Sequence, residues 1–205
     1  MGAAGMIDAR IAPLQARVLA PAARALAARG IGADAITLGG FALGLGGAAA
    51  AAAGAFGVAL ALILLNRVAD GLDGAVARLA GPTDRGAFLD IALDFVFYAA
   101  VPLGFAIHDP GANALAAAAL LAGFIGTGSS FLAHATLSAR RGMAPRRAGK
   151  GISYLGGLTE GAETIALFVA ICLWPGAFAP LAWGFAGLCA LTTLGRWRAG
   201  WRDFG

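Results

Sequence analysis

Two pairs of aspartates stand out in a sequence with few charged residues. Asp70 and Asp73 are three residues apart, and Asp90 and Asp94 are four apart, so each pair lies on one face of a helix. Acids inside an apolar segment are costly and therefore indicate function. Four clustered carboxylates repel one another unless they are protonated or bind cations. Oxygen ligands without Cys or His favour Mg²⁺, Mn²⁺ or Ca²⁺, and two such ions suit displacement at phosphorus.

The residues around the aspartates suit a substrate that carries phosphate. Gly74 and Ala77 continue the helical face of the first pair, and Gly86 precedes Asp90 by one turn. Their small side chains leave space for a group to approach the backbone. Arg78 adds a permanent, fork-shaped cation that matches phosphate oxygens. Small residues could instead serve helix packing, and acids could form an ion path, but these acids lie at one end of their segments.

The segments that carry these residues are apolar enough to cross a membrane. The chain has 205 residues, of which 60% are hydrophobic and 13% charged, and its mean hydropathy is +0.79. An ordinary soluble domain, with about a quarter of its residues charged, is therefore excluded. Six stretches approach the ~20 residues of a transmembrane helix: 36–53, 56–79, 88–107, 113–137, 152–173 and 178–194. We expect an all-α integral membrane protein of six transmembrane helices, in which a short turn makes the two aspartate-bearing helices antiparallel neighbours.

The basic residues predict the orientation of this bundle. All 15 Lys and Arg residues fall before the first segment, in the second and fourth connections, after the sixth segment, or near the inner end of the second. Cytoplasmic loops are enriched in these residues, so both termini should be cytoplasmic. Residues 1–33 are expected to form a leader with an interfacial amphipathic helix, 34–197 the bundle and 198–205 a cytoplasmic tail, all in one domain. The net charge of +4 fits contact with anionic membrane lipids, and no nucleic-acid-binding motif accompanies it.

The aspartate motif is similar to that of a known family. The pattern Asp70-x2-Asp73-Gly74-x2-Ala77-Arg78-x7-Gly86-x3-Asp90-x3-Asp94 resembles the signature of the CDP-alcohol phosphotransferases. The resemblance implies a membrane enzyme of phospholipid biosynthesis that displaces CMP from a CDP-linked alcohol by the hydroxyl of another alcohol. It also implies a bacterial-type inner membrane, with the active site facing the cytoplasm.

The resemblance assigns roles by position. Two ions, Mg²⁺ or Mn²⁺, would be bound by Asp70, Asp73, Asp90 and Asp94. Asp94 would be a bridging ligand or the general base. The cytidine diphosphate site would be lined by Gly74, Ala77, Arg78, Gly86 and Thr37. The family often has Pro-Asn where this chain has Ala33-Asp34, and we expect Asp34 to cap the first helix of the bundle.

The donor and the acceptor are less defined by the motif. The short six-span chain resembles the bacterial phosphatidyltransferases of the family, and this resemblance implies CDP-diacylglycerol as donor and a polar alcohol as acceptor. The alternative is transfer of a headgroup phosphate from a CDP-alcohol to a lipid alcohol, with His134 as a candidate base. Arg147 and Lys150 could bind a phosphorylated acceptor, or serve topology alone. Glu160 and Glu163, in the fifth segment, could hydrogen-bond a polyol or pair with an amine, or they could form structural ion pairs with Arg67 or Lys150.

Two further expectations concern assembly and function class. The excess of small residues predicts a homodimer through helix faces such as Gly40-x3-Gly44, a spacing that permits close helix approach. The alternative from another class is a metal-ion transporter or a non-catalytic membrane scaffold. The one-sided acids and the lack of an inverted repeat argue against it.

Overall fold

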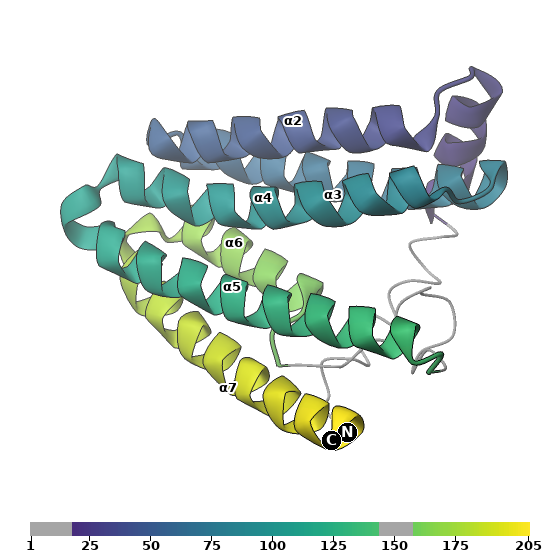
Figure 1. Ribbon diagram of the computed structural model, residues 1–205. Coiled ribbons are helices and arrows are strands. Elements are labelled where there is room, and N and C mark those ends of the chain that lie inside the picture. Colours follow the sequence, from purple (N-terminus) through teal and green to yellow (C-terminus); the bar gives the residue numbers. More distant parts are fainter. Residues whose placement is uncertain (1–17, 144–157) are drawn as a thin grey trace.

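A computed structural model describes residues 18–143 and 158–205 of the chain (Figure 1). Within these ranges the secondary structure is helical, which confirms the expected all-α fold. The helix Val18–Ala28 precedes α2 (Ala33–Ala52), α3 (Phe56–Ala80), α4 (Asp84–His108), α5 (Pro110–Arg140), α6 (Gly161–Leu173), the 3-10 helix η1 (Pro175–Ala177) and α7 (Phe178–Phe204).

Four helical stretches are long and apolar enough to cross a membrane, namely α2, α4, α5 and η1 with α7. The helix α3 carries Arg67 and the first aspartates of the acid motif along with its apolar residues, and α6 has 13 residues. The fifth predicted segment, 152–173, begins outside the described residues, and its helix starts only at Gly161 after the N-cap Glu160. The prediction of one helix through Glu160 is therefore wrong. Membrane crossing by α3 and α6, and the interfacial position of Val18–Ala28, stay predictions.

The turn between α3 and α4 is defined by local sequence. Gly81 has φ of +95°, a conformation that side chains with a Cβ rarely adopt. The hydroxyl of Thr83 then accepts a hydrogen bond from the backbone N–H of Gly86 at 3.1 Å and caps α4. This short connection makes α3 and α4 antiparallel and places both aspartate pairs at the same end of the molecule.

The helices form two groups that diverge toward one end. Figure 1 shows α2, α3 and α4 side by side, with α5, α6 and α7 beneath them; the groups meet at the α4–α5 turn. Buried aromatic rings fill the space between them, with Phe105 and Phe178 stacked at a centroid distance of 4.9 Å and Phe97 edge-on to Phe168 at 5.9 Å. The opposite end, which carries the α3–α4 turn and the C-terminal end of α5, is called the open end below.

The glycine pair expected at a dimer interface lies inside the protomer. A Cβ on Gly40 would lie 2.8 Å from the Cβ of Ala69 on α3, and one on Gly44 would lie 2.5 Å from a ring carbon of Phe97 on α4. Both glycines are buried. The assignment of this face to a dimer is therefore wrong, because the close approach it permits is to α3 and α4. A homodimer through another face stays a prediction.

A polar cluster joins α5 to the end of α7. His134 Nε2 lies 3.0 Å from Asp203 Oδ2, and Ser138 Oγ lies 3.3 Å from His134 Nδ1. His134 and Ser138 are buried, and Arg141 donates to the backbone carbonyl of Phe204 at 2.9 Å. These contacts give His134 a structural role, in line with hydrogen bonding inside a helix bundle.

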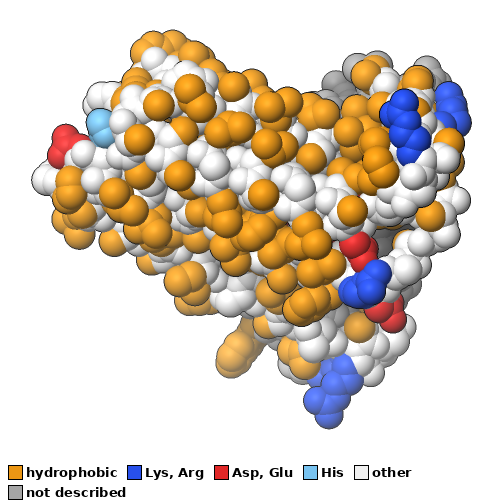
Figure 2. Space-filling view, turned by 90° about the horizontal axis from the view of Figure 1, so that it is seen from above, with side chains coloured by type: hydrophobic (Ala, Val, Ile, Leu, Met, Phe, Trp, Pro, Cys, Tyr) orange, Lys and Arg blue, Asp and Glu red, His pale blue; other side chains and the backbone are white. Residues whose placement is uncertain are grey.

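The surface is apolar over most of its length. Large side chains such as Leu65, Ile125 and Leu191 are exposed, which fits contact with lipid rather than water. In the face that Figure 2 shows, hydrophobic side chains cover the middle and the Arg side chains gather toward one end. This distribution agrees with the one-sided placement of basic residues along the sequence.

Candidate active site

Three of the four motif aspartates converge at the open end. Asp70 on α3 and Asp90 and Asp94 on α4 each place one carboxylate oxygen within 4.8 Å of the other two. Asp70 and Asp94 are partly buried and Asp90 is exposed. The helical spacing within each pair and the short α3–α4 turn together produce this arrangement. Such a set of hard oxygen donors fits Mg²⁺ or Mn²⁺.

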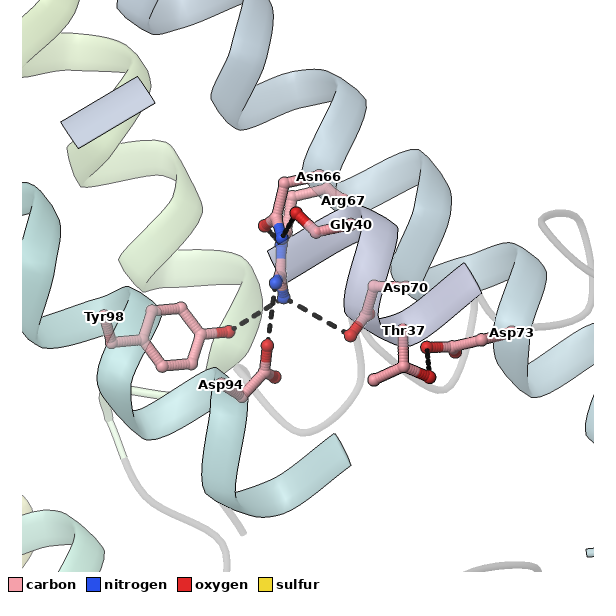
Figure 3. A network of polar contacts seen from close by, with 8 residues as sticks. All are labelled: Thr37, Gly40, Asn66, Arg67, Asp70, Asp73, Asp94 and Tyr98. Carbon is pink, nitrogen blue, oxygen red and sulfur yellow. Dashed lines mark hydrogen bonds and ion pairs between the residues drawn. The ribbon is translucent and has the colours of Figure 1, made fainter. Parts of the chain in front are cut away.

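The fourth motif aspartate, Asp73, is held by α2. Its Oδ2 accepts a hydrogen bond from the hydroxyl of Thr37 at 2.6 Å (Figure 3). Asp73 is buried and lies one helical turn beyond Asp70 on the same face of α3. Thr37 therefore contacts an acid of the motif directly, which connects α2 to the site.

Arg67, which the sequence offered as a partner of the two glutamates, lies among these acids. Arg67 Nη2 is 2.7 Å from Asp94 Oδ1, and its Nη1 is 3.6 Å from Asp70 Oδ1 (Figure 3). The residue precedes Asp70 by three positions, and this spacing alone indicates that it shares the acid face of α3. The acid cluster thus contains a permanent positive charge.

The small residues of the motif border the acids. Gly74 and Ala77 are partly buried and Arg78 is exposed; a Cβ on Gly74 would lie 3.3 Å from Arg78 Nη1. On α4, a Cβ on Gly86 would lie 3.2 Å from Asp34 Oδ1. The guanidinium of Arg78 thus lies over Gly74, where it can meet a group that approaches this face.

Asp34 does not cap α2, so that prediction is wrong. The N-cap is Gly32, no side chain caps the helix, and Asp34 lies inside its first turn. The carboxylate accepts a hydrogen bond from Arg85 Nε of α4 at 2.7 Å. This ion pair compensates the charge of Asp34 and ties the start of α2 to the start of α4.

Two cavities meet at the aspartates of α4. A small one is lined by Thr37, Arg67, Asp70, Asp73, Asp90 and Asp94 among others. A second, of about 700 Å³, extends between α4, α5, the start of α6 and α7, and Asp90 and Asp94 line it as well. This volume is in the range of small-molecule sites. Asp90 and Asp94 therefore contact both compartments.

The larger cavity includes one of the predicted acceptor residues. Glu160 is buried in its wall, and Glu160 and Glu163 together form a capping box at the start of α6, in which Glu163 Oε2 accepts from the Glu160 N–H at 3.0 Å. Arg147 and Lys150 lie outside the described residues. Arg196 of α7, which the sequence analysis did not single out, also lines this cavity and donates to a backbone carbonyl of α5 at 2.8 Å.

The chain is similar in sequence and in fold to known proteins. Residues 31–194 match the family model of the CDP-alcohol phosphatidyltransferases. The chain is 58% identical over 139 residues to the inner membrane protein YnjF of Escherichia coli (strain K12), covering 67% of this chain and 68% of that one. The crystal structure of Mycobacterium tuberculosis phosphatidylinositol phosphate synthase (PgsA1) with CDP-DAG bound is similar, with a TM-score of 0.74, 25% identity and coverage of 90% of this chain and 94% of that one. The same synthase in complex with manganese and citrate gives a TM-score of 0.73 at 23% identity, over 89% and 88% of the two chains.

Proposed function

The chain belongs to the CDP-alcohol phosphatidyltransferase family, and we propose that it transfers a phosphatidyl group from CDP-diacylglycerol to the hydroxyl of a polar alcohol, with release of CMP. Because it belongs to this family, the chain is a CDP-alcohol phosphotransferase. Family membership argues against the alternatives of a metal-ion transporter or a non-catalytic membrane scaffold. The observation that carries the proposal is the convergence of Asp70, Asp90 and Asp94 beside a cavity of about 700 Å³. The structurally similar synthase with bound CDP-DAG supports the choice of donor.

The acid cluster is proposed to hold two divalent cations. The three converging oxygens and the neighbouring carboxylate of Asp73 form a donor set without nitrogen or sulfur, which suits Mg²⁺ or Mn²⁺. The proposed ligands are Asp70, Asp73, Asp90 and Asp94. When bound, such ions neutralise negative charge on the diphosphate and on the departing CMP.

Asp94 is proposed as the general base. It lines both cavities, so an acceptor in the larger cavity can present its hydroxyl to the carboxylate. Arg67 contacts Oδ1 of Asp94 at 2.7 Å, and Oδ2 can take the hydroxyl proton. A P–O bond forms between the acceptor oxygen and the lipid-linked phosphorus, while the P–O bond to CMP breaks.

The nucleotide end of the donor is assigned to the small-residue face beside the acids. Gly74, Ala77 and Gly86 permit close approach to the backbone, and Arg78 can meet the diphosphate oxygens with its guanidinium. Thr37 borders the same region and, through its 2.6 Å contact, orients Asp73. Removal of the Thr37 hydroxyl should therefore affect the acid site as well as the nucleotide.

The acceptor is proposed to bind in the larger cavity. Its polar wall includes Glu160, Arg196 and threonines of α5 and α6, which suits an alcohol with several hydrogen-bonding groups. We assign Glu160 to the acceptor and Glu163 to the helix cap, because Glu160 is the one of the pair that lines the described cavity wall. Arg147 and Lys150 are the candidates for binding an acceptor phosphate.

The protein is proposed to reside in an inner membrane with the open end at the cytoplasmic face. The support is the apolar helices, the relative that is an inner membrane protein, and the basic residues near the open end, such as Arg78, Arg85 and Arg140. In this orientation a lipid donor can enter from the bilayer and a polar acceptor from the cytosol.

The test is a transfer assay with purified protein and Mg²⁺. CDP-diacylglycerol is offered with glycerol, glycerol 3-phosphate, inositol, inositol 1-phosphate or serine, and CDP-choline is offered with diacylglycerol. We expect a phosphatidyl-alcohol and CMP from one of the first combinations, identified by mass. Product only from CDP-choline with diacylglycerol would reverse the donor direction, and no CMP from any combination would contradict the proposal.

A further inference from the structure

Arg67 is a cation inside the acid cluster but outside the acid motif. It lies three residues before Asp70 on the same face of α3, and its guanidinium also reaches α4. Nη2 contacts Asp94 Oδ1 at 2.7 Å, and Nη1 lies 3.6 Å from Asp70 Oδ1. One side chain thus touches two of the three carboxylates that converge.

The position of this guanidinium is fixed by its surroundings. Arg67 Nε donates to Asn66 Oδ1 at 2.8 Å, and Asn66 Nδ2 donates to the backbone oxygen of Gly40 at 2.8 Å. The guanidinium lies 4.7 Å from the ring centre of Phe97, and Nη1 donates to the Tyr98 hydroxyl at 3.3 Å. Only 16% of the side chain is exposed. Residues of α2, α3 and α4 therefore hold the charge against the acids (Figure 3).

We propose that Arg67 is a built-in counter-ion, which occupies carboxylate oxygens of Asp94 and Asp70 and opposes the binding of divalent metal there. The proposal rests on the proposed function, because it takes these acids as the metal ligands. A cation beside a metal site repels the metal and competes with it for the ligand oxygens. Without metal, the same contacts offset the mutual repulsion of the acids.

The same contacts make Arg67 a positioning residue for Asp94. By holding Oδ1, the guanidinium sets the orientation of the carboxylate between the two cavities. Arg67 accordingly has two opposite effects: it weakens metal affinity and it supports turnover. A residue that merely stabilises the fold would not raise metal affinity when removed.

The test measures Mn²⁺ binding by electron paramagnetic resonance on purified Arg67→Gln, Arg67→Lys and wild-type protein. We expect Arg67→Gln to bind Mn²⁺ at least about tenfold more tightly than wild type. The repulsion between two positive charges this close is larger than the free-energy difference that a tenfold change in Kd represents. The kcat for CMP release should fall, with the KM for CDP-diacylglycerol nearly unchanged. Arg67→Lys keeps the charge and should bind Mn²⁺ close to wild type. Arg141→Gln, which removes a cation bound to the end of α7, is the matched control and should change neither quantity.

Several outcomes would overturn the proposal. Mn²⁺ affinity of Arg67→Gln equal to or weaker than that of wild type would contradict it while leaving the proposed function intact. If wild-type protein binds no Mn²⁺, both the proposed metal site and this inference fail. If Arg67→Gln is unstable, we expect Mn²⁺ to restore its melting temperature, because the metal supplies the missing positive charge. Instability that Mn²⁺ does not relieve would also refute the counter-ion role.

Discussion

Replacement of Asp94 by asparagine separates chemistry from folding more sharply than other single changes at this site. Asparagine keeps the shape of the side chain and an oxygen that can accept from Arg67 Nη2, which now lies 2.7 Å from Oδ1. The change removes the negative charge and with it the capacity to take a proton. We therefore expect Asp94→Asn to fold and to bind the donor, but to lose turnover.

The structure sets the size of both effects. The contact with Arg67 changes from a charge-paired hydrogen bond, worth about 1.5–3 kcal/mol, to one with a neutral acceptor, so the free energy of unfolding should fall by only about 1 kcal/mol. Loss of a general base lowers kcat by about 10²–10⁴-fold, which corresponds to roughly 3–5 kcal/mol in activation free energy. The kinetic loss should clearly exceed the loss of stability.

The assay measures initial rates of CMP release over a range of CDP-diacylglycerol concentrations, together with thermal unfolding and Mn²⁺ binding. Asp109→Asn is the matched control, because Asp109 caps α5 at the end of the bundle away from the site; its kcat should remain that of wild type. A kcat of Asp94→Asn within about twofold of wild type would remove Asp94 from the proton transfer, since base catalysis contributes at least about 10²-fold. A loss of Mn²⁺ binding as large as the loss of kcat would make Asp94 chiefly a ligand.

Three further predictions concern the surroundings of this residue. Excess EDTA should abolish turnover, measured as CMP release, and full activity in EDTA would contradict the metal site. Asp70→Asn and Asp90→Asn should also abolish CMP release, while their melting curves show that the protein is still folded. Glu160→Gln should raise the acceptor KM. Glu163→Gln should leave both the acceptor KM and the melting temperature close to wild type, because the glutamine oxygen can still accept the Glu160 N–H in the capping box. Equal changes of acceptor KM in both variants would refute the division of roles. His134→Leu should lower the free energy of unfolding by about 1–3 kcal/mol through the unpaired partners it leaves, with kcat unchanged; a selective loss of kcat would instead place His134 in the chemistry.

The convergence of the acids could be predicted because it depends on local geometry. Helical spacing places Asp70 and Asp73 on one face of α3 and Asp90 and Asp94 on one face of α4, and the turn at Gly81 makes the two helices antiparallel. Both features lie within residues 70–94, so they can be predicted without knowing which distant residues come into contact. The prediction that the two helices pack directly against each other is wrong, because α2 packs against both of them and their acids meet only through long side chains. The positions of α2 to α5 and the start of α7 could be predicted from the apolar stretches in the same way. The helix α7 continues to Phe204, through residues that the sequence analysis assigned to a tail.

Features that depend on distant residues could not be predicted from the sequence. The hydrogen bond from Thr37 to Asp73 joins residues 36 apart, and the partners of Gly40 and Gly44 are side chains of α3 and α4. A small-residue face is equally suited to a neighbouring helix and to a second protomer, so the pattern alone does not choose between them.

The start of α6, by contrast, is indicated by local sequence. Residues 156–161 read Gly-Gly-Leu-Thr-Glu-Gly, and this glycine-rich polar stretch interrupts the apolar run before α6. The capping box, with glutamates three residues apart, was a further signal, because a side-chain acceptor followed three residues later by Glu is typical of a helix N-terminus. The two acids are thus explained in part by helix capping rather than by function alone.

The most direct test of the central claim is the stoichiometry of transfer at the acid site. Wild-type protein and Asp90→Asn are incubated with CDP-diacylglycerol, Mg²⁺ and the alcohol panel, and CMP and the new phospholipid are quantified by mass in the same samples. We expect equal amounts of CMP and phosphatidyl-alcohol from wild type with at least one alcohol, and neither product above background from the variant. Absence of CMP from wild type with every alcohol, or equal turnover by Asp90→Asn, would contradict phosphatidyl transfer at this site.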